Sequence, residues 1–233
     1  MITRINQLPE TECDEYCSVK MKSLFRAYGT KYDFCQFYKQ TENGDTAAYI
    51  VKFYSSATVF VKQQENLEEL CGFLNTIGVS EITSNIQLEL NVKAKNFVQL
   101  KLSMNSCDGC DLNPKFDDYK LAHNLFSSDK SGNINVGDFD DWYVDLSHRV
   151  RHNAAYIFVD TCTAAVYLTD GKNLILNGIV AANKNKGYGT KLIEKIKNSS
   201  RENIVFVACN EETMPFYLKN GFKPNGNVYV YGV

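Results

Sequence analysis

The stretch that most constrains the fold runs from residue 173 to residue 196, NLILNGIVAANKNKGYGTKLIEKI. It begins with an apolar segment typical of a strand and continues through a polar loop with two glycines one residue apart. It ends in a segment where Leu192, Ile193 and Ile196 recur with helical spacing. The stretch thus reads as a strand, a loop and the N-terminus of a helix. It also places the unpaired amides of a helix N-terminus beside the loop, and such amides bind anions.

The residues of the loop suit a phosphate group. Gly187 and Gly189 let the backbone approach phosphate oxygens where a Cβ atom would intrude, and Thr190 adds a hydroxyl group. Lys184 and Lys186 supply positive charge. The loop of NTPases requires GxxxxGK followed by Ser or Thr, and the dinucleotide fingerprint requires a third glycine that this chain lacks. The stretch is therefore predicted to be a phosphate cradle of another class.

An internal repeat organises the chain. Residues 47–61, AAYIVKFYSSATVFV, align with residues 154–168, AAYIFVDTCTAAVYL, and each copy reads as a strand, a short turn and a strand. An amphipathic helix that contains a Leu-Phe pair precedes each copy. The alternative is chance similarity between amphipathic strands. Agreement across several elements favours two related α+β units, with residues 1–110 as the N-terminal domain and residues 111–233 as the C-terminal domain.

The two units diverge after the paired strands. The first continues into residues 62–79, KQQENLEELCGFLNTIGV. There Leu67, Leu70, Cys71 and Leu74 fall on one helical face, Gly78 lies just past the helix end, and no glycine pair occurs. The second inserts a further strand, residues 173–182, before its glycine loop. Only the second unit is therefore expected to have kept a phosphate site.

Charge and composition limit the possible partners. The formal net charge of -2 provides no global attraction to nucleic acid or to an anionic membrane. No apolar run reaches the roughly 18 residues that span a bilayer, and the N-terminal segment becomes acidic where a signal peptide would be apolar. We therefore expect a cytoplasmic protein that binds neither nucleic acid nor membrane. The oligomeric state cannot be predicted from the sequence.

The cysteines and histidines do not predict a metal site. Most of the eight cysteines lie in or near apolar segments, which favours reduced and buried thiols. Cys107 and Cys110 form a CxxC, but no second pair and no following helix pattern accompany them. His148 and His152 have metal-like spacing without an evident third ligand.

Two stretches together resemble motifs of the GNAT superfamily of N-acetyltransferases. Residues 184–189, KNKGYG, resemble the Q/RxxGxG/A motif that grips the pyrophosphate of acetyl-CoA. Residues 202–224, ENIVFVACNEETMPFYLKNGFKP, resemble the last strand and helix of the family, with a strand that ends at Asn210, then Tyr217 and a Gly-Phe turn. The resemblance extends over residues 118–233. It implies a mixed, mostly antiparallel sheet flanked by helices, as in acyl-CoA N-acyltransferases, here in tandem.

The motif also departs from the family pattern. Lys184 replaces the usual Arg or Gln, and it meets a phosphate as a point charge instead of a planar fork. Thr213 replaces a common Ala, and Pro215 lies in the last helix, where proline is tolerated in a first turn. The last helix is therefore expected to begin at about Thr213.

The resemblance implies direct transfer of an acetyl group from acetyl-CoA to a primary amine. It implies that backbone groups of Ile179, Val180 and Ala181 pair with the pantetheine arm and that Asn210 contacts the same arm. Tyr217 is implied as the general acid that protonates the CoA thiolate. The implied pyrophosphate site comprises Lys184, Asn185, Lys186, Gly187, Tyr188, Gly189 and Thr190.

The general base and the acceptor are not identified. The segment 173–182 contains no carboxylate, and for Asp160, Glu211 and Glu212 a surface role is the simpler reading. Family architecture implies that the acceptor enters between residues 118–153 and a final hairpin containing the C-terminal NVYVYGV. The alternative to an enzyme is a non-catalytic acyl-CoA-binding or interaction module.

Overall fold

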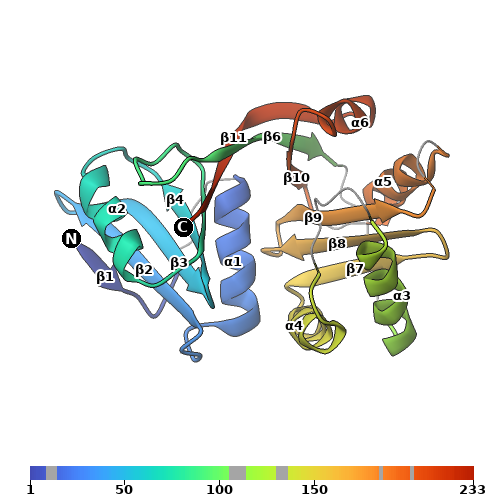
Figure 1. The fold of residues 1–233 in the computed structure, drawn as a ribbon, viewed down its shortest axis with the longest axis horizontal. Helices are drawn as coiled ribbons and strands as arrows, with labels where there is room; N and C mark the ends of the chain where they lie inside the picture. The colour runs from blue at the N-terminus through green and yellow to red at the C-terminus, as the bar shows by residue number, and fades with distance from the viewer. Residues whose placement is uncertain (9–14, 105–113, 130–135, 184–185, 200–201) are drawn as a thin grey trace.

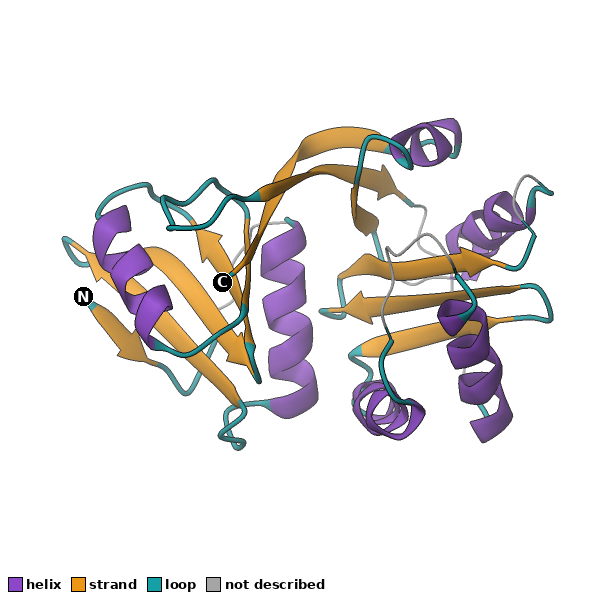
Figure 2. Ribbon diagram, viewed as in Figure 1, coloured by secondary structure: helices purple, strands orange, loops and turns teal. Residues whose placement is uncertain are grey.

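The computed structural model describes residues 1–8, 15–104, 114–129, 136–183, 186–199 and 202–233. Within these ranges, one sheet of 11 strands forms the centre of the molecule, and helices cover both of its faces (Figures 1 and 2). The strand order is β1-β2-β3-β4-β5-β11-β6-β10-β9-β8-β7. The predicted α+β class with a mixed, mostly antiparallel sheet is confirmed.

The chain forms two halves that lie side by side in Figure 1. The first half comprises β1 (Ile2–Arg4), α1 (Tyr16–Tyr28), β2 (Cys35–Glu42), β3 (Asp45–Phe53), β4 (Ser56–Val61), α2 (Leu67–Thr76), β5 (Glu81–Ser84) and β6 (Lys95–Ser103). The second half comprises α3 (Phe116–Ser127), α4 (Phe139–Arg151), β7 (Ala155–Val159), β8 (Thr163–Thr169), β9 (Asn173–Ala181), α5 (Tyr188–Ser199), β10 (Ile204–Cys209), α6 (Met214–Lys219) and β11 (Lys223–Gly232).

The two halves share one arrangement of elements. Each has three antiparallel strands, then a helix, then a strand parallel to the third: β2-β3-β4, α2 and β5 in the first half, and β7-β8-β9, α5 and β10 in the second. In the first half α2 and α1 pack on opposite faces of the sheet. In the second half α5 and α6 cover one face, and α3 and α4 cover the other.

Long strands are exchanged between the halves. β6, from the first half, pairs antiparallel with β10 of the second half. β11, from the second half, pairs antiparallel with β6 and then with β5 of the first half. In Figure 1 these two strands arch from one half to the other. The exchange joins both halves into a single hydrogen-bonded sheet.

Helix α1 forms a second connection, because it contacts both halves. It packs against β4 and also against β8, β9 and β10. Val19 of α1 belongs to the apolar cluster under α3 and α4. Arg26 donates to the backbone oxygens of His152 and Asp170 at 3.4 Å, and Lys22 lies 3.9 Å from the Asp170 carboxylate.

The structure corrects the interpretation of the internal repeat. The aligned segments 47–61 and 154–168 match β3 with β7 and β4 with β8, whereas the order of elements matches β3 with β8 and β4 with β9. The predicted insertion of a further strand at 173–182 is wrong, because β2 gives the first half a third strand as well. The sequence similarity is thus offset by one strand from the structural equivalence.

The C-terminal segment also differs from the prediction. NVYVYGV was expected in a hairpin beside the acceptor, but it belongs to the single strand β11, whose end pairs with β5 in the first half. This occurs because the exchanged β6 takes the place beside β11. The predicted domain boundary at residue 110, together with Cys107 and Cys110, lies outside the described residues, so the boundary stays a prediction.

Local signals for two helices are confirmed. Leu70 and Leu74 of α2 are buried, Asn66 caps the helix by accepting from the Glu69 amide, and Gly78 follows with φ of 66°. Helix α6 begins directly after its N-cap Thr213 and has a proline in its first turn.

The described thiols match the expectation for reduced cysteines. Cys17, Cys35, Cys71 and Cys209 are buried and free, and Cys162 is free and partly buried. Among the helices that the structure describes, none is long and apolar enough to cross a bilayer.

Candidate functional site

Strands β9 and β10 separate part of the way along their length. They pair in parallel only where residues 173–175 face residues 204–206. Beyond these pairs β9 continues to Ala181 beside β8, and β10 continues to Cys209 beside β6. The predicted pantetheine residues Ile179, Val180 and Ala181 therefore lie on a stretch of β9 for which the described part of the chain provides no strand partner on the β10 side. We call this gap the β9–β10 opening.

A β-bulge in β9 marks the start of the opening. Val166 pairs with Gly178 and Tyr167 pairs with Leu176, so Asn177 is an extra residue without a partner in β8. Such bulges bend a strand and increase its twist, and they occur often beside active sites. The bulge accompanies the divergence of β9 from β10.

The glycine loop leads to the N-terminus of α5, as predicted. Gly187 has φ of 77°, a left-handed conformation that favours glycine, and an added Cβ atom there would meet nothing within 4 Å. Gly189 has a different role, because a Cβ atom there would lie 3.0 Å from the Phe216 ring of α6. Lys184 and Asn185 lie outside the described residues.

The first turn of α5 suits an anion. It carries no acidic residue, Lys186 beside it is exposed, and Tyr188 and Thr190 are partly buried. The Lys191 amide already donates to the Gly187 oxygen at 3.0 Å, so the amides that remain for a ligand are those of the three preceding helical residues. The apolar stripe of α5 is buried, as the sequence predicted.

Tyr217 of α6 lies in the apolar cluster on the α5 and α6 face, with 7% of its surface exposed. Its ring contacts Phe216 and Phe222, with centroids 5.1 and 5.4 Å away. Burial, and to a smaller extent Cys209 and Tyr16, raises the pKa of Tyr217 well above its ordinary value. The phenol therefore keeps its proton at neutral pH, as a proton donor must.

Asn210 follows β10, and its side chain organises the start of α6. Its Oδ1 accepts from the Thr213 amide at 3.0 Å and from the Thr213 hydroxyl at 2.8 Å. These bonds close the turn of residues 210–213 that precedes α6. Contact between Asn210 and a pantetheine arm therefore stays a prediction, which would involve its remaining polar groups.

Two tyrosines near Tyr217 were missed in the sequence. Tyr167 of β8 is fully buried, its hydroxyl has no hydrogen-bond partner among the residues that the structure describes, and its pKa is raised by burial and by Tyr217. Tyr16, at the start of α1, is close enough to influence the pKa of Tyr217. Strand alternation places Tyr167 on one face of β8, but no sequence signal connects Tyr16 of the first half with this site.

The three carboxylates considered as a general base are either bonded to backbone amides or exposed. Asp160 accepts from the amides of Cys162 and Thr163 at 2.9 Å; although partial burial acts to raise its pKa, these bonds lower it. Glu211 and Glu212 are exposed.

His148 of α4 and the C-cap residue His152 are engaged by backbone oxygens. His148 Nε2 lies 2.9 Å from the Ala27 oxygen, and His152 Nδ1 lies 2.9 Å from the His148 oxygen. In the parts of the chain that the structure describes, no group of three or more His, Cys, Asp or Glu side chains could hold a metal ion.

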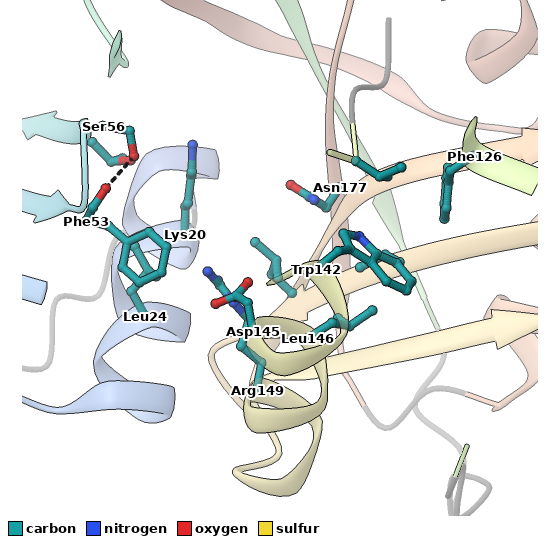
Figure 3. Close-up of a pocket in the computed structure, with 15 residues that line it drawn as sticks. Lys20, Leu24, Phe53, Ser56, Phe126, Trp142, Asp145, Leu146, Arg149 and Asn177 are labelled. Carbon is teal, nitrogen blue, oxygen red and sulfur yellow. Dashed lines mark hydrogen bonds and ion pairs between the residues drawn. The ribbon is translucent and has the colours of Figure 1, made fainter. Parts of the chain in front are cut away.

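A cavity of about 230 Å³ lies between the two halves, on the face of the sheet that α3 and α4 cover in the second half. Figure 3 shows α1 and α4 facing each other across it, with Lys20 on α1 and with Asp145 and Arg149 on α4. Asn177 and Gly178 of the β9 bulge form part of its wall. The cavity thus adjoins the start of the β9–β10 opening, on the face opposite Tyr217.

No protein-family model and no curated protein matches the sequence. Solved structures do share its fold. A GCN5-related N-acetyltransferase from Kribbella flavida superposes with a TM-score of 0.53 at 9% identity, covering 93% of this chain and 93% of that chain. A tandem GNAT protein from the clavulanic acid biosynthesis pathway superposes with a TM-score of 0.50 at 8% identity, covering 90% of this chain and 86% of that chain.

A third similar structure is the N-myristoyltransferase of Saccharomyces cerevisiae, solved with myristoyl-CoA and inhibitors. It has a TM-score of 0.50 and 11% identity, and the match covers 90% of this chain and 70% of that chain. At such identities the similarity shows a shared fold. The expected fold of acyl-CoA N-acyltransferases is confirmed.

Proposed function

We propose that this chain transfers an acetyl group from acetyl-CoA directly to a primary amine. The observation that carries the proposal is the β9–β10 opening. On one side of it β9 leads into the glycine loop and α5, and on the other side β10 leads into α6, which carries the buried phenol of Tyr217. A helix N-terminus without acidic residues suits the pyrophosphate. The backbone groups of β9 that have no strand partner among the described residues suit the amide-rich pantetheine arm. The phenol then supplies a proton where the thiolate leaves.

The reaction can be written with all atoms accounted for. The neutral amine nitrogen attacks the thioester carbonyl, a C–N bond forms, and the C–S bond breaks with its electron pair left on sulfur. Tyr217 donates its proton to that sulfur, and the excess proton on nitrogen passes to water, from which Tyr217 is reprotonated. Holding both reactants in place contributes several kcal/mol to such a step.

Packing beside the start of the β9–β10 opening favours a short acyl group. Leu176, Tyr167 and Tyr217 belong to one buried cluster on the α5 and α6 face. A long acyl chain directed to that face would have to displace these side chains, which are close-packed. We therefore propose acetyl-CoA as the donor.

The test uses Thr190 instead of either glycine, because a side chain at Gly189 would displace Phe216 and one at Gly187 would be strained. In a Thr190→Glu variant a carboxylate enters the first turn of α5, where it stabilises the helix but repels a pyrophosphate. Calorimetric titration should show binding of acetyl-CoA to the wild-type protein and at least ~10-fold weaker binding to the variant at low salt. Thr190→Gln is the matched neutral control and should bind within about two-fold of wild type.

Each outcome has a defined meaning. Equal binding by all three proteins would place the pyrophosphate elsewhere, and absence of binding by the folded wild type would refute the proposal. If acetyl-CoA binds but no primary amine causes release of the CoA thiol, the chain is the non-catalytic acyl-CoA-binding module. Binding together with amine-dependent thiol release supports the acetyltransferase.

A further inference from the structure

The cavity between the halves has an unbalanced positive charge. Two cationic side chains, Lys20 and Arg149, and one carboxylate, Asp145, line it. Arg149 Nε donates to Asp145 Oδ2 at 2.8 Å, and the other oxygen of Asp145 accepts from the Tyr28 hydroxyl. Both oxygens of the carboxylate are therefore engaged. Two cations and one anion leave one net positive charge in the wall of the cavity.

That charge belongs to Lys20. Its ammonium group makes no hydrogen bond or ion pair with the residues that the structure describes. Burial lowers the pKa of Lys20 and Arg149 lowers it further, while Cys17 and Glu81 act to raise it. A partly buried ammonium without a partner is unfavourable, and an anion bound beside it would relieve that cost.

The rest of the wall defines the size and polarity of a ligand. Leu24, Phe126, Trp142 and Leu146 make much of it apolar. Its volume is about 230 Å³. A small molecule with an apolar body fits such a space. Asn177, whose side chain has no hydrogen-bond partner among the described residues, offers an amide oxygen that can accept from an amine.

We propose that the acceptor is a small primary amine that carries a carboxylate on an apolar framework. The carboxylate binds Lys20, the apolar part contacts Trp142 and its neighbours, and the amine lies at Asn177, where the cavity meets the β9–β10 opening. This inference rests on the proposed function. Polyamines and aminoglycosides are disfavoured, because they would bring only positive charge to a cavity that already has an excess of it.

The only tryptophan of the chain, Trp142, lines this cavity and serves as a reporter of binding. Tryptophan fluorescence is measured during titration with two matched pairs: phenylalanine with phenethylamine, and 4-(aminomethyl)benzoate with benzylamine. Within each pair only one member has a carboxylate. We expect at least one carboxylate-bearing amine to bind about 10-fold more tightly than its partner, as a charge-assisted hydrogen bond predicts.

Variants assign that preference to Lys20. Lys20→Met keeps the length of the aliphatic stem and removes the charge, and it should reduce the preference to less than about three-fold without weakening the amine that lacks a carboxylate. Lys31→Met is the matched control, because it removes the same charge from an exposed residue and should keep the preference. Lack of a preference in the wild type, or its persistence in Lys20→Met, would overturn the inference.

Titration of the same preparations with acetyl-CoA separates this inference from the proposed function. Lys20-dependent binding of carboxylate-bearing amines without acetyl-CoA binding would leave the pocket assigned and refute the transferase. Acetyl-CoA binding with equal turnover of amines that have and lack a carboxylate would support the transferase and refute this acceptor class.

Discussion

The gap between the third strand and the strand that follows the helix is closed in the first half, between β4 and β5, and open in the second, between β9 and β10. In both halves the strand after the helix ends at an asparagine, Asn85 after β5 and Asn210 after β10. Asn85 Oδ1 accepts from the Val61 amide at 2.8 Å, and Asn85 Nδ2 donates to the Val61 oxygen at 3.0 Å. Its side chain thereby continues the ladder between β4 and β5. Asn210 instead closes the turn before α6, and β9 separates from β10.

The N-termini of α2 and α5 also differ, in whether acidic side chains compensate the helix dipole. The first turn of α2 contains Glu68 and Glu69, and Glu69 also lies 2.9 Å from the N-terminal amine. The partial positive charge at the N-terminus of α2 is thus compensated by carboxylates of the chain itself. The first turn of α5 has no acidic residue. One topology therefore provides a closed, self-compensated end in the first half and an open, electropositive end in the second.

The largest expected effect tests whether catalysis takes place at the β9–β10 opening of the second half. Tyr217→Phe removes the proposed proton donor but keeps the ring that packs on Phe216 and Phe222, so kcat should fall at least ~10-fold while acetyl-CoA binding is unchanged. Tyr231→Phe is the control. Its hydroxyl is bonded to the Leu88 backbone in the first half, so this change should lower stability and leave kcat unaltered. Unchanged turnover in Tyr217→Phe would remove Tyr217 from the mechanism.

The two asparagines provide the next test. Asn85→Ala leaves two backbone groups of Val61 without their partner and should lower the free energy of unfolding by about 1–3 kcal/mol. Asn210→Ala removes the hydrogen bonds that close the turn before α6 and should cost about 1 kcal/mol. Urea unfolding measures both values, and calorimetry with acetyl-CoA should show weaker binding only for Asn210→Ala. A loss of acetyl-CoA binding in Asn85→Ala would contradict the assignment of the first half as closed.

The smallest expected effect concerns pH. Burial raises the pKa of Tyr217 above its ordinary value, so the phenol stays protonated as pH rises. Consequently kcat should not decline through loss of this proton between about pH 8 and pH 10. A decline in this range in the wild type, absent from the residual activity of Tyr217→Phe, would show that Tyr217 is exposed enough to ionise there.

Local patterns predicted the elements that form the site. The apolar stripes of α2 and α5 depend on helical spacing, and the start of α6 depends on Pro215 in its first turn, so each could be recognised without knowledge of the fold. The repeat was recognised but matched with an offset of one strand, because amphipathic strands with period two resemble one another at any such offset.

The exchanged strands and the cavity could not be predicted. The sequences of β6 and β11 indicate strands, but strand partners are chosen by long-range packing and by backbone groups that are the same in every residue. Lys20 is ordinary in the sequence, as one lysine in an amphipathic helix. Only the packing of α1 against the second half brings it to a wall shared with Arg149 and Asn177.

The sequence by itself determined the fold class, the glycine turn before α5 and the helix that carries Tyr217, because these depend on the spacing and conformational preferences of neighbouring residues. The tertiary structure decided which of two similar strand ends is open, which strands cross between the halves and where Lys20 lies. Asn85 and Asn210 have the same local setting at the end of a strand. Their hydrogen bonds differ because the partners within reach, the backbone of Val61 and the start of α6, are set by the packing of distant segments.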